Sequence, residues 1–196
     1  MTRTIGLLLF PGTEELDAVG PWEVLAFWTQ FFPDDGYTAF TFSRDGGPVK
    51  CAKGLTIEAE YSFDTAPRRD VLIIPGGMGT RPMLTDEPML SWVRAQRDTT
   101  PLITSVCTGS LVLAAAGLLS GRPATTHWKS LSRLTELDPS IELRPEDRFV
   151  DDGDIVTAAG VSAGIDMALH LVRRLSSDDR AREVRRLIQY DPAPPV

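Results

Sequence analysis

Residues Pro101-Leu102-Ile103-Thr104-Ser105-Val106-Cys107-Thr108-Gly109-Ser110-Leu111-Val112-Leu113-Ala114-Ala115-Ala116-Gly117 decide the fold of this chain. The first part, up to Val106, is a short apolar run that indicates a buried strand. The part after Cys107 is rich in small residues, as in a helix that lies close to a sheet. Cys107 stands where the strand passes into the helix. This is the layout of a nucleophile elbow, in which a tight turn lifts a reactive side chain above the sheet edge.

Strand-like and helix-like segments alternate along the rest of the chain. The patterns predict strands at 5–10, 37–43 and 71–74, hairpin turns at 45–47 and 151–154, and helices at about 14–32, 87–97, 108–116, 162–175 and 178–189. This alternation predicts an α/β fold, a mostly parallel sheet with helices on both faces. We expect a single domain over residues 1–196, with a frayed Pro-rich tail at 191–195.

The composition excludes several classes of protein. The chain has 196 residues, of which 42% are hydrophobic and 24% charged. Two cysteines cannot build a disulfide framework, and the apolar runs are far shorter than a bilayer span. The chain opens without a secretory signal, so we expect a cytoplasmic protein with no membrane partner.

The charge balance argues against a nucleic-acid partner. The formal net charge is −7 and the pI is near 4.9, whereas nucleic-acid binders usually carry a basic face. One basic cluster, around 180–186, is interleaved with acidic residues. Mixed signs at helical spacing predict a solvated, salt-bridged helix face.

The two cysteines are predicted to differ. Cys107 lies at a helix N-terminus, whose partial positive charge favours the nucleophilic thiolate over the thiol. The alternative is a buried cysteine that packs as a small hydrophobe. Cys51 follows the predicted turn at 45–47 and has neither an elbow nor a helix dipole behind it. We therefore interpret Cys51 as structural.

Three loops, at 11–17, 75–80 and 106–110, are expected at the carboxyl ends of strands, where such sheets bind ligands. The second contains Pro75-Gly76-Gly77-Met78-Gly79, which matches neither the dinucleotide fingerprint nor the P-loop. Its glycines allow backbone N–H groups to face a developing anion, and with the Thr108 N–H they would form an oxyanion hole. A plain turn is the alternative.

Asp17 is the acidic residue of interest in the first loop. Glu14 and Glu15 fit a helix N-terminus at the surface. Asp17 is flanked by apolar residues, so burial is expected to raise its pKa, and a nearby thiolate would raise it further. Such a carboxyl can donate a hydrogen bond and carry protons.

The two histidines offer less. His127 follows the elbow helix by one loop and is either the base of a Cys–His pair or a packed residue behind the site. His170 lies inside an amphipathic helical pattern and is interpreted as structural. With two histidines and two cysteines widely separated, no metal spacing is present, and we expect no metal and no cofactor.

These segments resemble the ThiJ/PfpI superfamily, which shares the flavodoxin-like core of class I glutamine amidotransferases. The resemblance covers nearly the whole chain, and within the superfamily it is greatest to the isocyanide hydratases. The segments that carry it are Leu9-Phe10-Pro11, Leu16-Asp17-Ala18-Val19-Gly20-Pro21, Ile74-Pro75-Gly76-Gly77, Thr104-Ser105-Val106-Cys107-Thr108-Gly109-Ser110, Ala124-Thr125-Thr126-His127-Trp128, Ala163-Gly164-Ile165-Asp166 and Tyr190-Asp191-Pro192-Ala193-Pro194-Pro195.

The resemblance implies a role for each matching position. Cys107 would be the nucleophile and Asp17 the acidic partner that hydrogen-bonds it; many members carry Glu there, whereas isocyanide hydratases carry Asp. Thr108 occupies the position after the nucleophile, where PfpI-protease-like and glyoxalase-like members often have His. Gly77 would be the backbone donor facing the cysteine.

The implied activity is that of a hydro-lyase, which adds water to a small-molecule isocyanide and gives an N-substituted formamide through a Cys thioimidate. The resemblance also implies a cytoplasmic homodimer with the elbow near the subunit boundary. Trp22, Trp128 and Val161 are candidates for lining the substrate pocket. The alternatives are an oxidation sensor or stress-response protein without enzymatic activity, and a glyoxalase- or deglycase-like hydrolase.

One further similarity bears on the function. The Thr-His-Trp and Cys-Thr-Gly elements also resemble the sensor domain of some AraC-type regulators. In those regulators a DNA-binding helix-turn-helix region follows the domain. We expect no such region within these 196 residues.

Overall fold

The computed structural model describes residues 2–192, and the Pro-rich tail is in part outside this range. A six-stranded sheet in the order β2-β1-β5-β6-β10-β9 forms the centre. All neighbouring strands are parallel except β9, which pairs antiparallel with β10. The strands are β1 (Arg3–Leu8), β2 (Tyr37–Phe42), β5 (Val71–Ile74), β6 (Leu102–Val106), β9 (Phe149–Asp151) and β10 (Ile155–Ala158). The predicted mostly parallel α/β sheet is confirmed.

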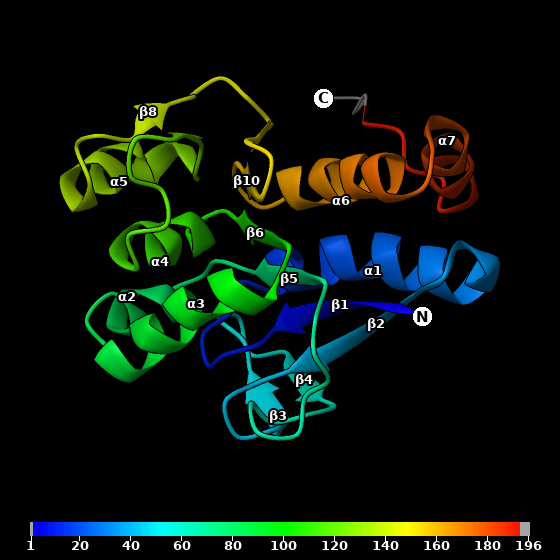
Figure 1. Ribbon diagram of the computed structural model, residues 1–196, viewed down its shortest axis with the longest axis horizontal. Helices are drawn as coiled ribbons and strands as arrows, with labels where there is room; N and C mark the ends of the chain where they lie inside the picture. Colours follow the sequence, from blue (N-terminus) through cyan, green and yellow to red (C-terminus); the bar gives the residue numbers. More distant parts are fainter. Residues whose placement is uncertain (1, 193–196) are drawn as a thin grey trace.

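Helices cover the sheet in two layers (Figure 1). One layer consists of α1 (Glu15–Phe31), α6 (Ala163–Leu175) and α7 (Asp178–Leu187). The other contains α2 (Thr80–Met83), α3 (Glu87–Thr99), α4 (Gly109–Ala115) and α5 (Leu131–Leu137). Both layers exist because each buried strand presents apolar side chains alternately to the two faces.

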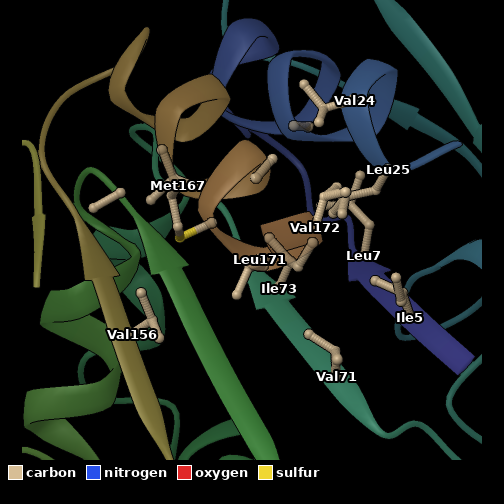
Figure 2. Close-up of a cluster of buried hydrophobic side chains, with 14 of the residues drawn as sticks. Ile5, Leu7, Val24, Leu25, Val71, Ile73, Val156, Met167, Leu171 and Val172 are labelled. Atoms are coloured by element: carbon tan, nitrogen blue, oxygen red, sulfur yellow. The ribbon is translucent and has the colours of Figure 1, made fainter. Parts of the chain in front are cut away.

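The alternation is visible in the side chains of β5. Val71 and Ile73 contribute to the core under α1 and α6, and Leu72 and Ile74 contribute to the core under α3 and α4. Figure 2 shows the first core, where Ile73 of β5 lies beside Leu171 and Val172 of α6. All four β5 side chains are at most 1% exposed. The apolar run at 71–74 is therefore buried on both faces, as the sequence predicts.

The smaller elements surround this framework. They are the 3-10 helices η1 (Pro33–Asp35) and η2 (Trp128–Ser130), and the short strands β3 (Gly47–Lys50), β4 (Thr56–Ala59), β7 (Pro123–Ala124) and β8 (Glu142–Leu143). No helix among residues 2–192 is long and apolar enough to cross a lipid bilayer.

The predicted hairpin turn at 45–47 is wrong. Gly46 and Gly47 do adopt positive φ (76° and 69°), but the strands on either side join different sheets. β2 pairs in parallel with β1, and β3 pairs antiparallel with β4. A glycine turn reverses the chain without specifying which strands pair, because the apolar β2 gains more by entering the central sheet. The hairpin at 151–154 is confirmed by the antiparallel pairing of β9 with β10.

Candidate active site

Cys107 lies between the end of β6 and the start of α4. The residue as a whole is only 6% exposed. Its φ is +56°, in the left-handed region that residues with a Cβ rarely adopt. The chain therefore turns sharply at the cysteine itself. Such a residue costs on the order of 1–3 kcal/mol and persists only where the surroundings hold it in place.

Hydrogen bonds to the Cys107 backbone supply that support. Its N–H donates to the carbonyls of Ala158 (3.1 Å) and Ala159 (3.0 Å) at the end of β10. Its carbonyl accepts from the hydroxyls of Ser110 (3.0 Å) and Thr126 (2.9 Å). The neighbouring strand and the loop before η2 thus fix the turn, and the side chain is left for chemistry.

Asp17 reaches the same place from the first turn of α1. Its side chain is fully buried, and Oδ2 accepts a hydrogen bond of 3.0 Å from the Gly76 N–H. Oδ1 is buried without a hydrogen-bond partner among the described residues. Burial raises the pKa of Asp17 to about 7, against the opposing influence of Cys107 and of the Gly76 N–H. The raised pKa of Asp17 agrees with the expectation, and its mutual electrostatic influence with Cys107 places the two side chains close together. The role of Asp17 in catalysis stays a prediction.

The pKa of Cys107 departs from the expectation. Burial, followed by the charge of Asp17, raises it to about 12, while the backbone N–H groups of Thr108 and Val161 oppose the rise. The predicted lowering by the helix N-terminus is therefore wrong in its net direction, because loss of hydration outweighs the N–H dipoles. The two groups titrate as a pair. Between pH 7 and 12 this pair holds one proton and one negative charge.

The glycine loop after β5 packs against Asp17 and Thr108. A Cβ on Gly76 would lie 2.6 Å from Asp17 Oδ2 and 2.6 Å from Thr108 N, so only glycine fits there. The Gly77 N–H donates to Thr108 Oγ1 (3.0 Å). The role of Gly77 as a donor toward a reacting anion stays a prediction, since its N–H is engaged by the threonine here.

A cavity of about 200 Å³ opens above Cys107. It is lined by Glu14, Gly77, Met78, Arg81, Cys107, Thr108, His127, Lys129, Ser130 and Val161. His127 therefore faces the same space as the cysteine. Burial and the charges of Lys129 and Arg81 lower the pKa of His127, so its imidazole is neutral at pH 7. Nδ1 accepts from the Lys129 N–H (3.2 Å).

Other predicted residues lie elsewhere. Of the three proposed pocket residues, Val161 lines the cavity and Trp22 and Trp128 do not. His170 is outside it and contacts Asp151 (Nε2 to Oδ2, 2.6 Å). Cys51 is buried without contact to the cavity, and burial raises the pKa of its thiol. No cluster of three or more metal-ligating side chains occurs within residues 2–192.

Three contributions to the site are absent from the sequence analysis. Val161 supplies a backbone N–H to Cys107 from a strained position with φ of +47°, and a backbone group leaves no side-chain signal. Thr126 holds the Cys107 carbonyl. Arg81 and Lys129 place two cations at the cavity. The position of Val161 in the loop that follows β10 is the available clue, since ligand sites gather at carboxyl ends of parallel strands.

Comparison with known proteins relates this arrangement to enzymes and to regulators. The model of the DJ-1/PfpI family matches residues 3–174. The chain is 42% identical over 196 residues to an isonitrile hydratase of Pseudomonas putida, covering all of this chain and 82% of that protein. It is also 31% identical over 185 residues to the HTH-type transcriptional regulator CdhR of Pseudomonas aeruginosa, covering 94% of this chain and 54% of the regulator.

The solved structures agree with this relationship. The crystal structure of a ThiJ/PfpI family protein from Pseudomonas syringae superposes with a TM-score of 0.87 at 34% sequence identity. The match covers all of this chain and 78% of that one. The family model and both alignments span the cysteine turn, the glycine loop and Asp17. The chain belongs to the DJ-1/PfpI family.

Proposed function

We propose that this protein is an isocyanide hydratase, which converts R–N≡C and water to the formamide R–NH–CHO. The buried Asp17 carboxyl beside Cys107, with a pKa near neutrality, carries the proposal, because it gives the site a nucleophile and a proton carrier that share one proton. The 42% identity to an isonitrile hydratase along the whole chain supports the choice of substrate.

The first step forms a bond between sulfur and carbon. In the reactive form of the pair, the proton resides on Asp17 and Cys107 is a thiolate. The thiolate adds to the electrophilic isocyanide carbon, and the same carbon takes the Asp17 proton. The product is the thioimidate Cys–S–CH=N–R beside an anionic Asp17. The N–H groups of Thr108 and Val161, which already lower the pKa of Cys107, stabilise the thiolate before attack.

Water completes the reaction. Asp17 takes a proton from the attacking water and passes it to the nitrogen, which gives Cys–S–CH(OH)–NH–R. The C–S bond then breaks, sulfur leaves as thiolate, and the hydroxyl proton returns to Asp17. Each cycle adds one water to one isocyanide and restores the starting pair. These steps use only side chains of this chain and water.

The rival function is that of an oxidation sensor without enzymatic activity, in which Cys107 reports the oxidation. The similarity to the regulator CdhR favours it. The chain is 42% identical to the isonitrile hydratase and covers 82% of it, whereas it is 31% identical to the regulator and covers 54% of it. We therefore favour the enzyme.

The test is incubation with an alkyl isocyanide, with the formamide measured by mass spectrometry. We expect turnover by the unmodified protein and a loss of about 10³-fold or more in Cys107→Ser, since a hydroxyl is a far weaker nucleophile at neutral pH. Cys51→Ser is the matched control and should keep full activity. Absence of formamide from the unmodified protein, or full turnover by Cys107→Ser, would contradict the proposal.

A further inference from the structure

Two cationic side chains, Arg81 and Lys129, line the Cys107 cavity. Arg81 comes from α2, and its guanidinium donates to the Gly77 carbonyl (3.0 Å) and contacts Thr80 Oγ1 (3.0 Å). Lys129 comes from η2, and its Nζ lies 5.0 Å from the centre of the Trp128 ring. Neither cation forms a salt bridge with a carboxylate in the part of the chain that the structure describes.

The other charged groups at the cavity leave these cations unbalanced. Glu14 also lines the cavity, but its carboxylate is bound by the Lys53 ammonium, which comes from the loop after β3. Burial, and after it the charges of Lys129 and Arg81, lower the pKa of His127, so the field of these two cations reaches the imidazole. The remaining negative charge is the one shared by Cys107 and Asp17 at the buried end.

This polarity suits a substrate with two different ends. An isocyanide carbon is uncharged and can approach the buried thiolate. A carboxylate is stabilised where a guanidinium and an ammonium are exposed, and guanidinium binds carboxylate through parallel hydrogen bonds. The cavity of about 200 Å³ is also smaller than the roughly 300–1,000 Å³ typical of sites for drug-sized ligands. Its volume therefore favours a short molecule.

We infer that the substrate is a small isocyanide that carries a carboxylate, held by Arg81 and Lys129 while its isocyano group faces Cys107. This inference rests on the proposed hydratase function for the isocyano group. The selection for an anion rests on the two cations alone and can be measured separately. Arg81 and Lys129 are thus specificity-determining residues.

Alkylation of Cys107 measures anion selection without requiring turnover. The probes are iodoacetate and iodoacetamide, which differ in charge and little in size, and the readout is the ratio of their rate constants at Cys107 by peptide mass spectrometry. We expect Arg81→Gln and Lys129→Gln each to lower the iodoacetate-to-iodoacetamide ratio by about twofold to fivefold, as for loss of one exposed ionic contact. Arg81→Lys should retain the ratio. Arg133→Gln, on α5 and outside the cavity, is the matched control.

The iodoacetamide rate shows whether each variant keeps a native site. The ratio in the unmodified protein should also fall as salt rises from 20 to 500 mM, because salt screens exposed charges. An unchanged ratio in both Gln variants would overturn the inference, whether or not the protein hydrates isocyanides.

Hydration assays then address the substrate itself. The pair is isocyanoacetate and its neutral amide, isocyanoacetamide. We expect kcat/KM to favour the acid, and Arg81→Gln and Lys129→Gln to reduce that preference mainly by raising KM for the acid. Equal kcat/KM for acid and amide would overturn the inference and leave the hydratase function standing. Hydration of neither, with a charge-dependent alkylation ratio, would refute the hydratase function and retain the selection for anions.

Discussion

Asp17 lies in a buried position, where loss of hydration penalises its charged form and its carboxyl lies near Cys107. Its carboxyl is fully buried in the first turn of α1 and has one hydrogen bond, from the Gly76 N–H. We expect Asp17→Asn to reduce hydration by roughly 10²–10⁴-fold, as for loss of an acid–base group. Asp17→Glu keeps the acid but displaces it by a methylene, and a shift of about 1 Å can cost roughly 10²-fold.

The control for these variants is Glu15→Gln, which keeps an acceptor for the Lys53 N–H and lies outside the cavity lining. Steady-state formamide production by the three variants, beside their rates of thiol alkylation, measures the effect. Normal turnover by Asp17→Asn would show that another group carries the proton.

Asp17→Asn should also stabilise the protein above neutral pH. The folded pKa of about 7 exceeds the unfolded value of 3.8. The stability that a protonated Asp17 contributes is thus present below pH 3.8 and lost as pH rises through 7. Asn has no such dependence. We expect the advantage of Asp17→Asn over the unmodified protein to grow by about 2 kcal/mol between pH 5 and 7.5. Urea unfolding at both pH values measures it, and an advantage that does not change with pH would contradict a raised pKa.

At the scale of elements, the contact between α4 and β5 depends on one glycine. A Cβ on Gly109 would lie 2.2 Å from the Ile74 carbonyl oxygen and 2.9 Å from that of Pro75. Backbone atoms cannot rotate away, so Gly109→Ala should destabilise by about 3 kcal/mol or more.

The matched control is Gly117→Ala, at the end of the same helical region. Its Cβ would meet nothing within 4 Å, although φ is +78°, so about 1 kcal/mol is expected. Urea midpoints compare the two variants. Equal stability would mean that α4 does not approach the strand so closely.

The elements that were predictable are those whose own composition decides their structure. The strand at 71–74 and the strand leading to Cys107 are continuous apolar runs, and both enter the central sheet. The segments β4, α2 and α5 were not predicted. α2 has four residues and no side-chain cap, so contacts with the rest of the molecule determine it. The pairing of β3 with β4 is likewise determined by tertiary contacts.

The candidate site divides in the same way. Cys107 and Asp17 stand out because a thiol in a turn and a carboxyl among apolar residues are unusual in sequence. The Thr126 hydroxyl donates to the Cys107 carbonyl. The Val161 backbone N–H is directed at the Cys107 sulfur. Neither contribution has a residue-type signature, so only the folded chain reveals it.

For the molecule as a whole, we expect a homodimer. The groove formed by α1, α6 and the end of α7 is lined by exposed apolar side chains, including Leu16 (40% exposed), Val19 (39%) and Leu187 (47%). Such patches are typical of surfaces that associate. Sedimentation at micromolar concentration should give twice 21.5 kDa, and Val19→Lys should weaken the association. A monomer at 21.5 kDa would contradict the prediction.

The surroundings of Cys107 can form only late in the folding of each chain. Cys107 is held by Ala158 and Ala159 from beyond it in sequence and is paired with Asp17 from ninety positions before it. Contacts between such distant residues form slowly, because long loops must close first. During synthesis, the thiol therefore acquires its partners only after β10 has left the ribosome and docked. After dilution from urea, the native rate of Cys107 alkylation should consequently return later than the circular dichroism signal of the helices.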